Sequence, residues 1–309
     1  MKQSKKTIVR LLQKTLINNG HSYLLKIFFF LRSFKKFKRS INTQKNFSIF
    51  SKQNLNEINN FEYKITSQNN EDGIIDYIFT KIPNNKYFCE IGFSYYEFNS
   101  LNLIKNGWSG KLIDANKNDA LALETNLSFF FPKARIEILN NFVTKDNIND
   151  LVYGENKKNI IDFFSIDIDG NDYWVLKNLD LNSINVICCE YNNWLGNDRI
   201  TMKYIEDKEF KDDGIFGASL SAITELLNLK DFYLIGVESS GTNAFFVNKR
   251  FKDKFKIVSP DDCYKSVNRF YSEEKKRMIY KNIKNSKLLQ YLWFFTEQSN
   301  RRQQAMMFQ

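Results

Sequence analysis

Three acidic side chains follow one apolar segment of the chain, and their types and spacing suit proton transfer or metal binding. Asp167, Asp169 and Asp172 surround Gly170, the single glycine of residues 163–174. A continuous apolar run that ends in a turn signal predicts a strand buried on both faces, as in parallel sheets covered by helices. In such sheets, ligands bind outside the carboxyl ends of the strands. The sequence therefore predicts a functional edge at these carboxylates.

Two other predicted strands also end in acidic residues. Glu90 and Gly92 end the first strand, and Asp114 ends the second, 22 positions after Gly92. An acid about 20 residues beyond the first turn is placed to accept hydrogen bonds from ribose hydroxyls. The glycine-rich turn that approaches a pyrophosphate is missing, because residues 93–96 read FSYY. The pattern disfavours NAD and FAD and favours a nucleoside ligand without phosphates.

Apolar and helix-like segments alternate along most of the chain. Strands alternating with helices of this length predict βαβ units and a mostly parallel sheet. The last two strands are expected to form a hairpin whose turn, Gly241–Thr242–Asn243, faces the opposite edge of the sheet from the acids. The expected strands are residues 86–92, 110–115, 135–139, 160–168, 185–190, 232–236 and 244–247, and the expected helices are residues 67–82, 99–106, 119–130, 145–153, 220–229 and 272–295.

The formal net charge of +10 is concentrated near the start of the chain. Residues 1–40 contain eleven Lys or Arg and no Asp or Glu. They form either a surface for nucleic acid, anionic lipid or an acidic partner, or a solvated helix packed on the main domain. The apolar run 23–31 is too short to span a bilayer, and no signal-peptide cleavage pattern follows it.

The histidine and cysteine content excludes several classes of enzyme. His21 is the only histidine and lies in the basic segment, which argues against Ser-His-Asp and Cys-His catalysis and against histidine-rich metal sites. The four cysteines lack the paired spacing of a zinc or redox motif. Most lie in apolar strand candidates and are expected to be buried as small hydrophobic residues. They are Cys89, Cys188, Cys189 and Cys263.

Several motifs in consistent order carry a resemblance to a known family. They are EIG at residues 90–92, GWSGKLIDAN at 107–116, SIDIDGNDYWVLKNL at 165–179, CCEYNNWLG at 188–196 and a match over 217–247. The chain resembles class I S-adenosylmethionine-dependent methyltransferases, and within them the branch related to FkbM-type O-methyltransferases. The resemblance implies an α/β fold, a Rossmann-like three-layer sandwich with a mostly parallel seven-stranded sheet that ends in an antiparallel hairpin.

The resemblance also divides the chain and assigns roles to residues. It implies a basic helical extension and connector (1–60), a methyltransferase-like α/β domain (61–250) and a C-terminal helical extension (251–309). It puts the methionine part of the cofactor near Glu90 and Gly92, and the ribose near Asp114. Adenine is expected near Asn140 and Asn141, and the reacting methyl group near Asp167.

One turn departs from the family pattern. Ser94 and Tyr96 stand where members of the family commonly have small residues, glycine especially. A β-carbon and a phenol ring at these positions are expected to narrow or close the cofactor cleft. This departure leaves a second hypothesis open: a degenerate methyltransferase fold that serves as a non-catalytic binding or scaffolding module.

Methyl transfer to a hydroxyl needs an acceptor for the proton, and with no histidine nearby the first choice is Asp167. Metal activation is the other option. Asp167, Glu190 and Asn192 are hard oxygen ligands at neighbouring strand ends, as Mg²⁺ prefers, in an arrangement similar to catechol-type methyltransferases. Asp169 and Asp172 are expected to shape the turn and cap the helix that follows.

Aromatic residues near the strand ends are expected either to form a platform for a sugar or planar acceptor, or to pack in the core and rim. They are Tyr95, Tyr96, Tyr173, Trp174, Tyr191 and Trp194.

The sequence therefore predicts an O-methyltransferase that acts on a small-molecule or carbohydrate hydroxyl, in the cytoplasm or at its membrane face. Residues 1–40 are the expected contact with a membrane or an acidic partner. A third hypothesis, an RNA acceptor bound by residues 1–40, ranks last because no RRM, KH or similar module is visible.

Overall fold

A seven-stranded sheet in the order β3-β2-β1-β4-β5-β8-β7 forms the centre of the computed structural model, which describes residues 22–47, 52, 54–154, 160–206, 213–265 and 272–292. The first five strands in this order pair in parallel, and β8 is antiparallel to both β5 and β7. The predicted sheet, mostly parallel and ending in an antiparallel hairpin, is confirmed. The strands are β1 (Tyr87–Ile91), β2 (Ser109–Asp114), β3 (Ile136–Asn140), β4 (Ile161–Ile166), β5 (Ile184–Glu190), β7 (Phe232–Val237) and β8 (Asn243–Asn248).

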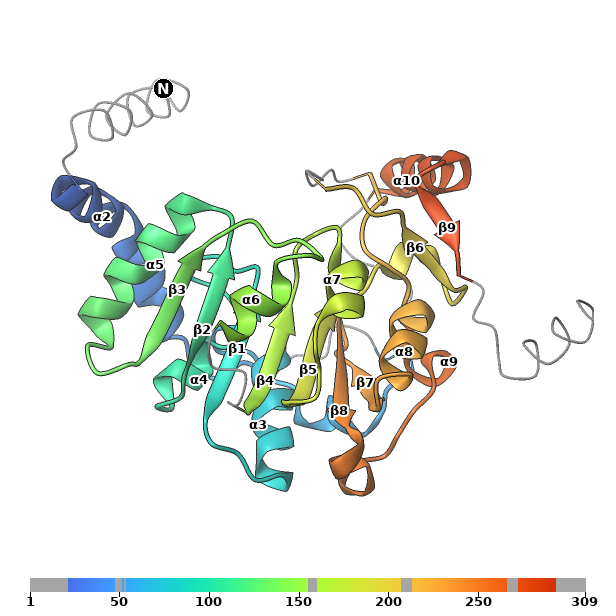
Figure 1. Ribbon diagram of the computed structural model, residues 1–309, viewed down its shortest axis with the longest axis horizontal. Coiled ribbons are helices and arrows are strands. Elements are labelled where there is room, and N and C mark those ends of the chain that lie inside the picture. Colours follow the sequence, from blue (N-terminus) through green and yellow to red (C-terminus); the bar gives the residue numbers. More distant parts are fainter. Residues whose placement is uncertain are drawn as a thin grey trace, which may run out of the picture.

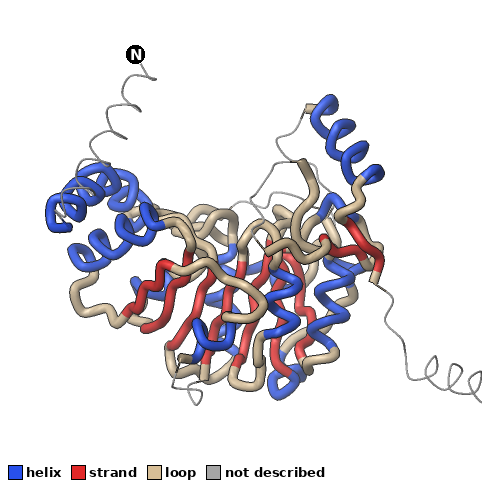
Figure 2. The backbone as a smooth tube through the Cα atoms, turned by 45° about the horizontal axis from the view of Figure 1, so that its top comes forward, coloured by secondary structure: helices blue, strands red, loops and turns tan. Residues whose placement is uncertain are grey.

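Helices cover both faces of the sheet and make it the middle layer of three (Figure 1; Figure 2). Every residue of β4 is buried, and its alternate side chains enter two different apolar clusters: Phe163 on one face, Phe164 and Ile166 on the other. This alternation is the period of two expected of a strand covered on both sides. One layer contains α3 (Glu71–Lys81), α4 (Leu101–Lys105) and α5 (Lys117–Phe130), and the other contains α6 (Ile148–Tyr153), α7 (Asp172–Asn178) and α8 (Leu220–Asn228).

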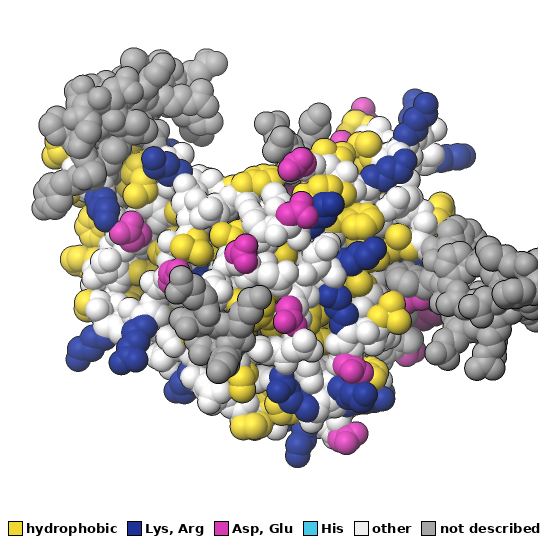
Figure 3. Space-filling view, in the orientation of Figure 1, with side chains coloured by type: hydrophobic (Ala, Val, Ile, Leu, Met, Phe, Trp, Pro, Cys, Tyr) yellow, Lys and Arg dark blue, Asp and Glu magenta, His cyan; other side chains and the backbone are white. Residues whose placement is uncertain are grey.

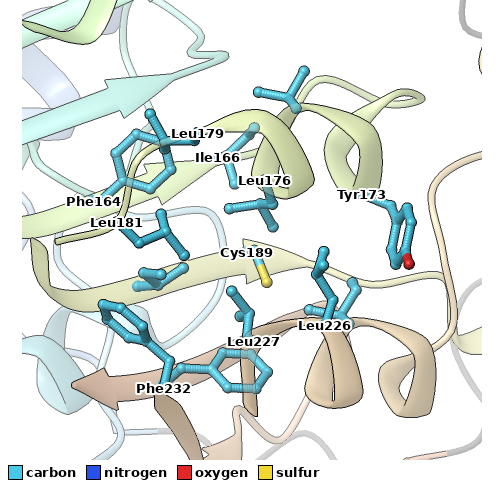
Figure 4. Packing of buried hydrophobic residues seen from close by; sticks show 14 of the residues in the cluster. Phe164, Ile166, Tyr173, Leu176, Leu179, Leu181, Cys189, Leu226, Leu227 and Phe232 are labelled. Atoms are coloured by element: carbon cyan, nitrogen blue, oxygen red, sulfur yellow. The ribbon is translucent and has the colours of Figure 1, made fainter. Parts of the chain in front are cut away.

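The core on the second face is dense and apolar (Figure 4). Phe164 lies beside Leu179 and Leu181, and Cys189 lies between Leu176 of α7 and Leu226 of α8. All four cysteines are free and buried, which confirms their interpretation as small hydrophobic residues. The burial of this layer fixes α7, and with it the turn that carries the acidic motif.

The described part of the basic segment forms helix α2 (Ser22–Ile41), which packs against α5. Phe29, Ser33 and Phe37 recur at helical spacing and are buried. The amide of Asn126 in α5 donates to the Ser33 hydroxyl oxygen at 2.6 Å. No helix within the described residues is long and apolar enough to cross a membrane. His21 lies outside the described residues.

The C-terminal segment differs from its prediction. Helix α10 (Glu273–Asn285) ends well before residue 295, and β9 (Leu289–Tyr291) pairs antiparallel with β6 (Ile200–Met202). Neither short strand was predicted, because three residues show no clear period and their pairing depends on a distant segment. The remaining elements are η1 (Glu57–Phe61), η2 (Asn193–Leu195), η3 (Lys249–Lys254) and α9 (Pro260–Cys263).

The ends of β1 and β4 approach each other closely at Gly92. This residue has a φ of +79°, and a β-carbon there would lie 1.7 Å from the carbonyl oxygen of Asp167. The Asp167 amide donates to the Ile91 carbonyl at 2.9 Å, and the Gly92 amide to the Ile113 carbonyl at 2.9 Å. Gly92 is therefore required by its neighbouring strands, since any side chain would push β4 away.

Replacing Gly92 by alanine is expected to lower the free energy of unfolding by at least about 3 kcal/mol, because backbone strain adds to the collision with Asp167. Gly107→Ala is the matched control: Gly107 has the same φ of +79° but open space around its α-carbon. Its cost is expected to be only about 1 kcal/mol. Urea unfolding of both variants tests this, and equal losses would contradict it.

Candidate functional site

A cavity of about 690 Å³ opens at the carboxyl ends of the parallel strands. Its size is in the usual range for small-molecule sites. Ser94 and Tyr96 belong to its wall, so the turn after β1 borders the cavity and does not fill it. Six of the predicted site residues line the cavity, namely Glu90, Gly92, Asp114, Asn141, Asp167 and Glu190, whereas Asn192 is not in its lining.

Three carboxylates that keep some exposure meet in the lining of this cavity. Asp167, Asp169 and Glu190 offer oxygen atoms that all lie within 4.8 Å of one another; we call them the acidic triad. Burial, followed by the charges of Asp169 and Asp172, raises the pKa of Asp167 to about 8. Burial and the Asp167 charge raise the pKa of Glu190 well above its ordinary value. The triad is thus suited to sharing a proton or holding a cation.

Asp169 and Asp172, the two later acids of the turn after β4, have different surroundings in the structure. Asp172, which was expected to cap the helix, instead accepts hydrogen bonds from the Ile168 amide at 2.8 Å and the Gly170 amide at 3.0 Å, and so holds the turn. It is the first residue of α7, and Asn171 takes the cap position. Asp169, which was expected only to shape the turn, has a φ of +54° and joins the triad.

Asn192, the predicted third metal ligand, lies elsewhere. Its Nδ2 atom donates to the carbonyl oxygens of Gly214 and Phe216, both at 2.9 Å. Its Oδ1 atom accepts from the Trp194 amide at 3.0 Å. This buried side chain anchors the loop after β5, and the geometry favours Asp169 as the third member of the cluster.

Glu90 lines the cavity but also holds the start of α4. Its carboxylate accepts from the Asn99 amide at 2.9 Å, from the Ser100 amide at 2.7 Å and from the Ser100 hydroxyl. Burial raises the pKa of Glu90 to about 7, against the opposing effect of these hydrogen bonds. The residue therefore positions the segment that follows the Gly92 turn.

Asp114 joins the tips of β1 and β2. Its Oδ2 atom accepts from the Phe93 amide at 3.0 Å, and burial raises its pKa. The Asn141 amide donates to the Asp114 carbonyl at 3.1 Å, which brings the chain after β3 to the same edge. Asn141 lines the cavity, but Asn140 lines a separate hollow beside α5.

The hairpin turn between β7 and β8 was predicted at the wrong edge. Because β8 runs antiparallel to β5, and β7 antiparallel to β8, β7 is parallel to the main sheet and ends at the same edge as β4. Ser240, Gly241, Thr242 and Asn243 accordingly line the cavity. Asn243 lies opposite Glu190 in the ladder, and its amide donates to Glu71 at 2.7 Å. Tracing strand direction through the hairpin would have found these residues.

The aromatic candidates divide between the cavity and the core. Tyr96, Tyr191 and Trp194 line the cavity. Tyr173 belongs to the apolar core, and the Trp174 indole donates to the Met202 carbonyl at 2.8 Å. Only part of the predicted platform therefore borders the cavity.

Comparisons with known proteins give similarities of fold only. No protein-family model matches the chain, and no curated protein matches it. An S-adenosylmethionine-dependent methyltransferase from Clostridium acetobutylicum is 11% identical at a TM-score of 0.39, over 58% of this chain and 90% of that chain. Magnesium protoporphyrin IX methyltransferase from Synechocystis PCC 6803, with bound S-adenosylhomocysteine, is 10% identical at a TM-score of 0.38, over 58% of this chain and 81% of that chain.

The N-terminal domain of EvdMO1, also with bound S-adenosylhomocysteine, is 10% identical at a TM-score of 0.40, over 59% of this chain and 80% of that chain. The first two of these structures are methyltransferases and the last two hold S-adenosylhomocysteine, but TM-scores this low carry no argument about the activity of this chain. The argument for function depends on the sheet and the cavity themselves.

The raised pKa of Glu90 predicts how stability changes with pH. A carboxyl whose pKa is higher in the folded state binds more protons when folded, so stability falls as pH rises from about 4.5 to about 7. The glutamine of the Glu90→Gln variant cannot ionise. The variant is therefore expected to show a decrease in the free energy of unfolding that is smaller by about 2 kcal/mol over this pH range. Denaturant unfolding between these pH values measures it, with Glu97→Gln, another carboxylate of the cavity wall, as control. A Glu90→Gln profile as steep as the wild-type profile would contradict the assignment.

Proposed function

We propose that this protein is an S-adenosylmethionine-dependent O-methyltransferase acting on a hydroxyl group of a small molecule or carbohydrate. The position of the cavity carries the proposal. In the order β3-β2-β1-β4-β5, the sequence of strands reverses between β1 and β4. Ligands of open α/β sheets bind at this switch point, outside the carboxyl ends of the strands. The cavity lies there, with Asp114 on one side and the acidic triad on the other.

The charges of the cavity favour this cofactor over a nucleotide. Acidic side chains line it, and no Lys or Arg does among the described residues. Such a wall repels phosphates but suits a sulfonium compound with an ammonium group and no phosphate. We assign the ribose to Asp114, as a charged acceptor, and the adenine to the apolar wall at Phe142 and Val143 beside Asn141. The methionine part is assigned to Glu90 and Gly92.

The chemistry assigns Asp167 to the proton of the acceptor. S-Adenosylmethionine supplies, when bound, a methyl group on a positively charged sulfur. Asp167 would accept the proton that the acceptor hydroxyl loses when its oxygen takes the methyl group from the sulfur. A carboxyl with a pKa of about 8 is suited to this task near neutral pH. Glu190, hydrogen-bonded to Asp167, stabilises the pair by sharing the proton.

The same wall narrows the class of acceptor. The acids nearest the proposed reaction centre would repel a carboxylate or phosphate on the acceptor. Asn193, Trp194, Ser240 and Thr242 line this end of the cavity and provide amide, indole and hydroxyl groups. Such groups suit a neutral polyol, and we therefore favour a carbohydrate hydroxyl.

We place the reaction in the cytoplasm, since a chain with four free, buried cysteines and no disulfide among its described residues suits a reducing compartment.

As the alternative to proton transfer to Asp167, the acidic triad fits Mg²⁺ as a second cofactor. Three carboxylates within 4.8 Å of one another are hard oxygen donors of the kind that this ion takes together with water. Asp167, Asp169 and Glu190 would hold the ion, which would lower the pKa of a nearby hydroxyl.

Titration calorimetry with S-adenosylmethionine tests the proposed function. The wild type is expected to bind, and Asp114→Ala to bind at least ~10-fold more weakly, since a charged hydrogen-bond acceptor is lost. Asp167→Asn is expected to keep most of the affinity but lose methyl transfer. Asp253→Asn, at an exposed residue of η3, is the control for charge. Absence of wild-type binding at millimolar cofactor would contradict the proposal and favour a non-catalytic binding or scaffolding module.

The metal assignment has its own test, in which Mg²⁺ or Mn²⁺ alone is titrated into the protein. Asp169→Asn is expected to weaken ion binding at least ~10-fold, because one of three carboxylate ligands loses its charge. Glu97→Gln removes a cavity carboxylate outside the triad and should leave binding unchanged. If neither ion binds, or if both variants bind alike, the triad is not a metal site.

A further inference from the structure

Two basic helices lie on opposite sides of the cavity. Figures 1 and 2 show α2 and α10 at the two ends of the sheet, both toward its carboxyl edge. The Lys36 ammonium of α2 lies 3.3 Å above the ring of Tyr96, and Tyr280 of α10 contacts the ring of Trp194 at 5.5 Å between centroids. Tyr96 and Trp194 both line the cavity. Each helix therefore forms part of its border.

Helix α2 exposes an apolar ridge on the side away from the protein. Leu24, Ile27 and Leu31 follow one another at helical spacing and are all exposed, Leu31 at 72%. Phe29, Ser33 and Phe37 are buried on the other side. The helix carries only positive charges. Lys26 pairs with Glu124 and Lys36 covers Tyr96, but Lys35, Lys38 and Arg39 are exposed beyond the ridge.

Helix α10 has a similar composition on the opposite border. Ile279 is buried, while its neighbours Met278 and Tyr280 are about half exposed, at 48% and 52%. The acids of this helix stand in its first turn, where Glu273 pairs with Lys276. Its second half is basic and exposes Lys281 and Lys284, and exposed Lys287 follows the end of the helix. Figure 3 shows Lys and Arg side chains near both helices and also along the lower edge of the molecule.

We propose that α2 and α10 are the two rims of one docking face for an anionic lipid membrane, with the cavity opening between them. Amphipathic helices that combine exposed apolar side chains with Lys and Arg bind the headgroup region of such membranes. The apolar ridge of α2 would enter the interface, and the basic side chains of both rims would contact lipid headgroups. Charge complementarity thus identifies the occupant of this face.

A membrane explains the face better than RNA does. RNA is bound through phosphate contacts and stacking on aromatic or guanidinium planes, and an exposed Leu31 contributes to neither. A strand passing from one rim to the other would also cross the carboxylates of the cavity wall. A lipid surface can contact the rims separately and leave the acidic hollow between them.

The docking face also indicates where the methyl acceptor would be held, an inference that rests on the proposed function. A cavity that opens toward a membrane would receive hydroxyl groups from molecules held at that membrane. The acceptor would then be a neutral polyol group carried on a lipid or lying at the lipid surface.

Vesicle flotation of the full chain tests the docking face. The probes are vesicles of phosphatidylcholine alone and of phosphatidylcholine with about 30% phosphatidylserine. One variant reverses charges on α2 (Lys35→Glu, Lys38→Glu, Arg39→Glu), and a second does so on and beside α10 (Lys281→Glu, Lys284→Glu, Lys287→Glu). The matched control makes the same change at exposed residues beyond the far end of β8 (Lys252→Glu, Lys254→Glu, Lys256→Glu). Leu31→Ser removes the most exposed apolar side chain of the ridge.

The wild type is expected to bind only the anionic vesicles. Each rim variant should lower the partition coefficient for anionic vesicles at least ~10-fold. The control variant should lower it less than ~2-fold, and Leu31→Ser should lower it about 3-fold. The proposal is overturned if the wild type does not bind, if the control loses as much as the rim variants, or if RNA binds and vesicles do not. Calorimetry with S-adenosylmethionine on the same variants distinguishes the docking face from the proposed function. A variant that loses vesicle binding but still binds the cofactor would leave the proposed function unaffected.

Discussion

The contact between the ends of β1 and β4 at Gly92 determines most of what the site can be. With no side chain at Gly92, the Asp167 backbone passes within van der Waals reach, and the two strands stay paired up to the edge. This pairing aims the Asp167 side chain into the cavity between Glu90 and Glu190. In families with a glycine-rich turn the glycines are usually explained by the ligand. Here Gly92 is required by the sheet itself.

The second constraint is the number of carboxylates that the site holds out of water. Buried carboxyls are costly unless they accept hydrogen bonds or stay protonated. Glu90 and Asp172 are satisfied by backbone amides, and they fix the segments on either side of the cavity. No backbone amide donor is seen for Asp167 or Glu190 among the described residues, whereas burial raises the pKa of all four carboxyls. The acids that position the chain and those to which we assign the chemistry therefore differ in their hydrogen bonds, although all four follow or end apolar strands.

These differences explain what the sequence could predict. The parallel sheet and its hairpin follow from apolar runs that alternate with helices, and the acids at strand ends follow from the direction of those strands. The short pair β6 and β9 has no local pattern, and its formation depends on contacts between residues 200–202 and 289–291. Asn192 and Asp169 could not be distinguished as ligands, because that choice depends on which side chain the 214–216 loop engages. The Gly241 turn was misplaced by counting the hairpin as antiparallel to the sheet as a whole.

A crystal structure of the protein soaked with S-adenosylmethionine tests the central claim most directly, because that claim concerns where one ligand lies. The account predicts density for the adenosine between Asp114 and Phe142, and for the methyl group within reach of Asp167. Density at another place, or an empty cavity in which Tyr96 lies against Asp114, would contradict it.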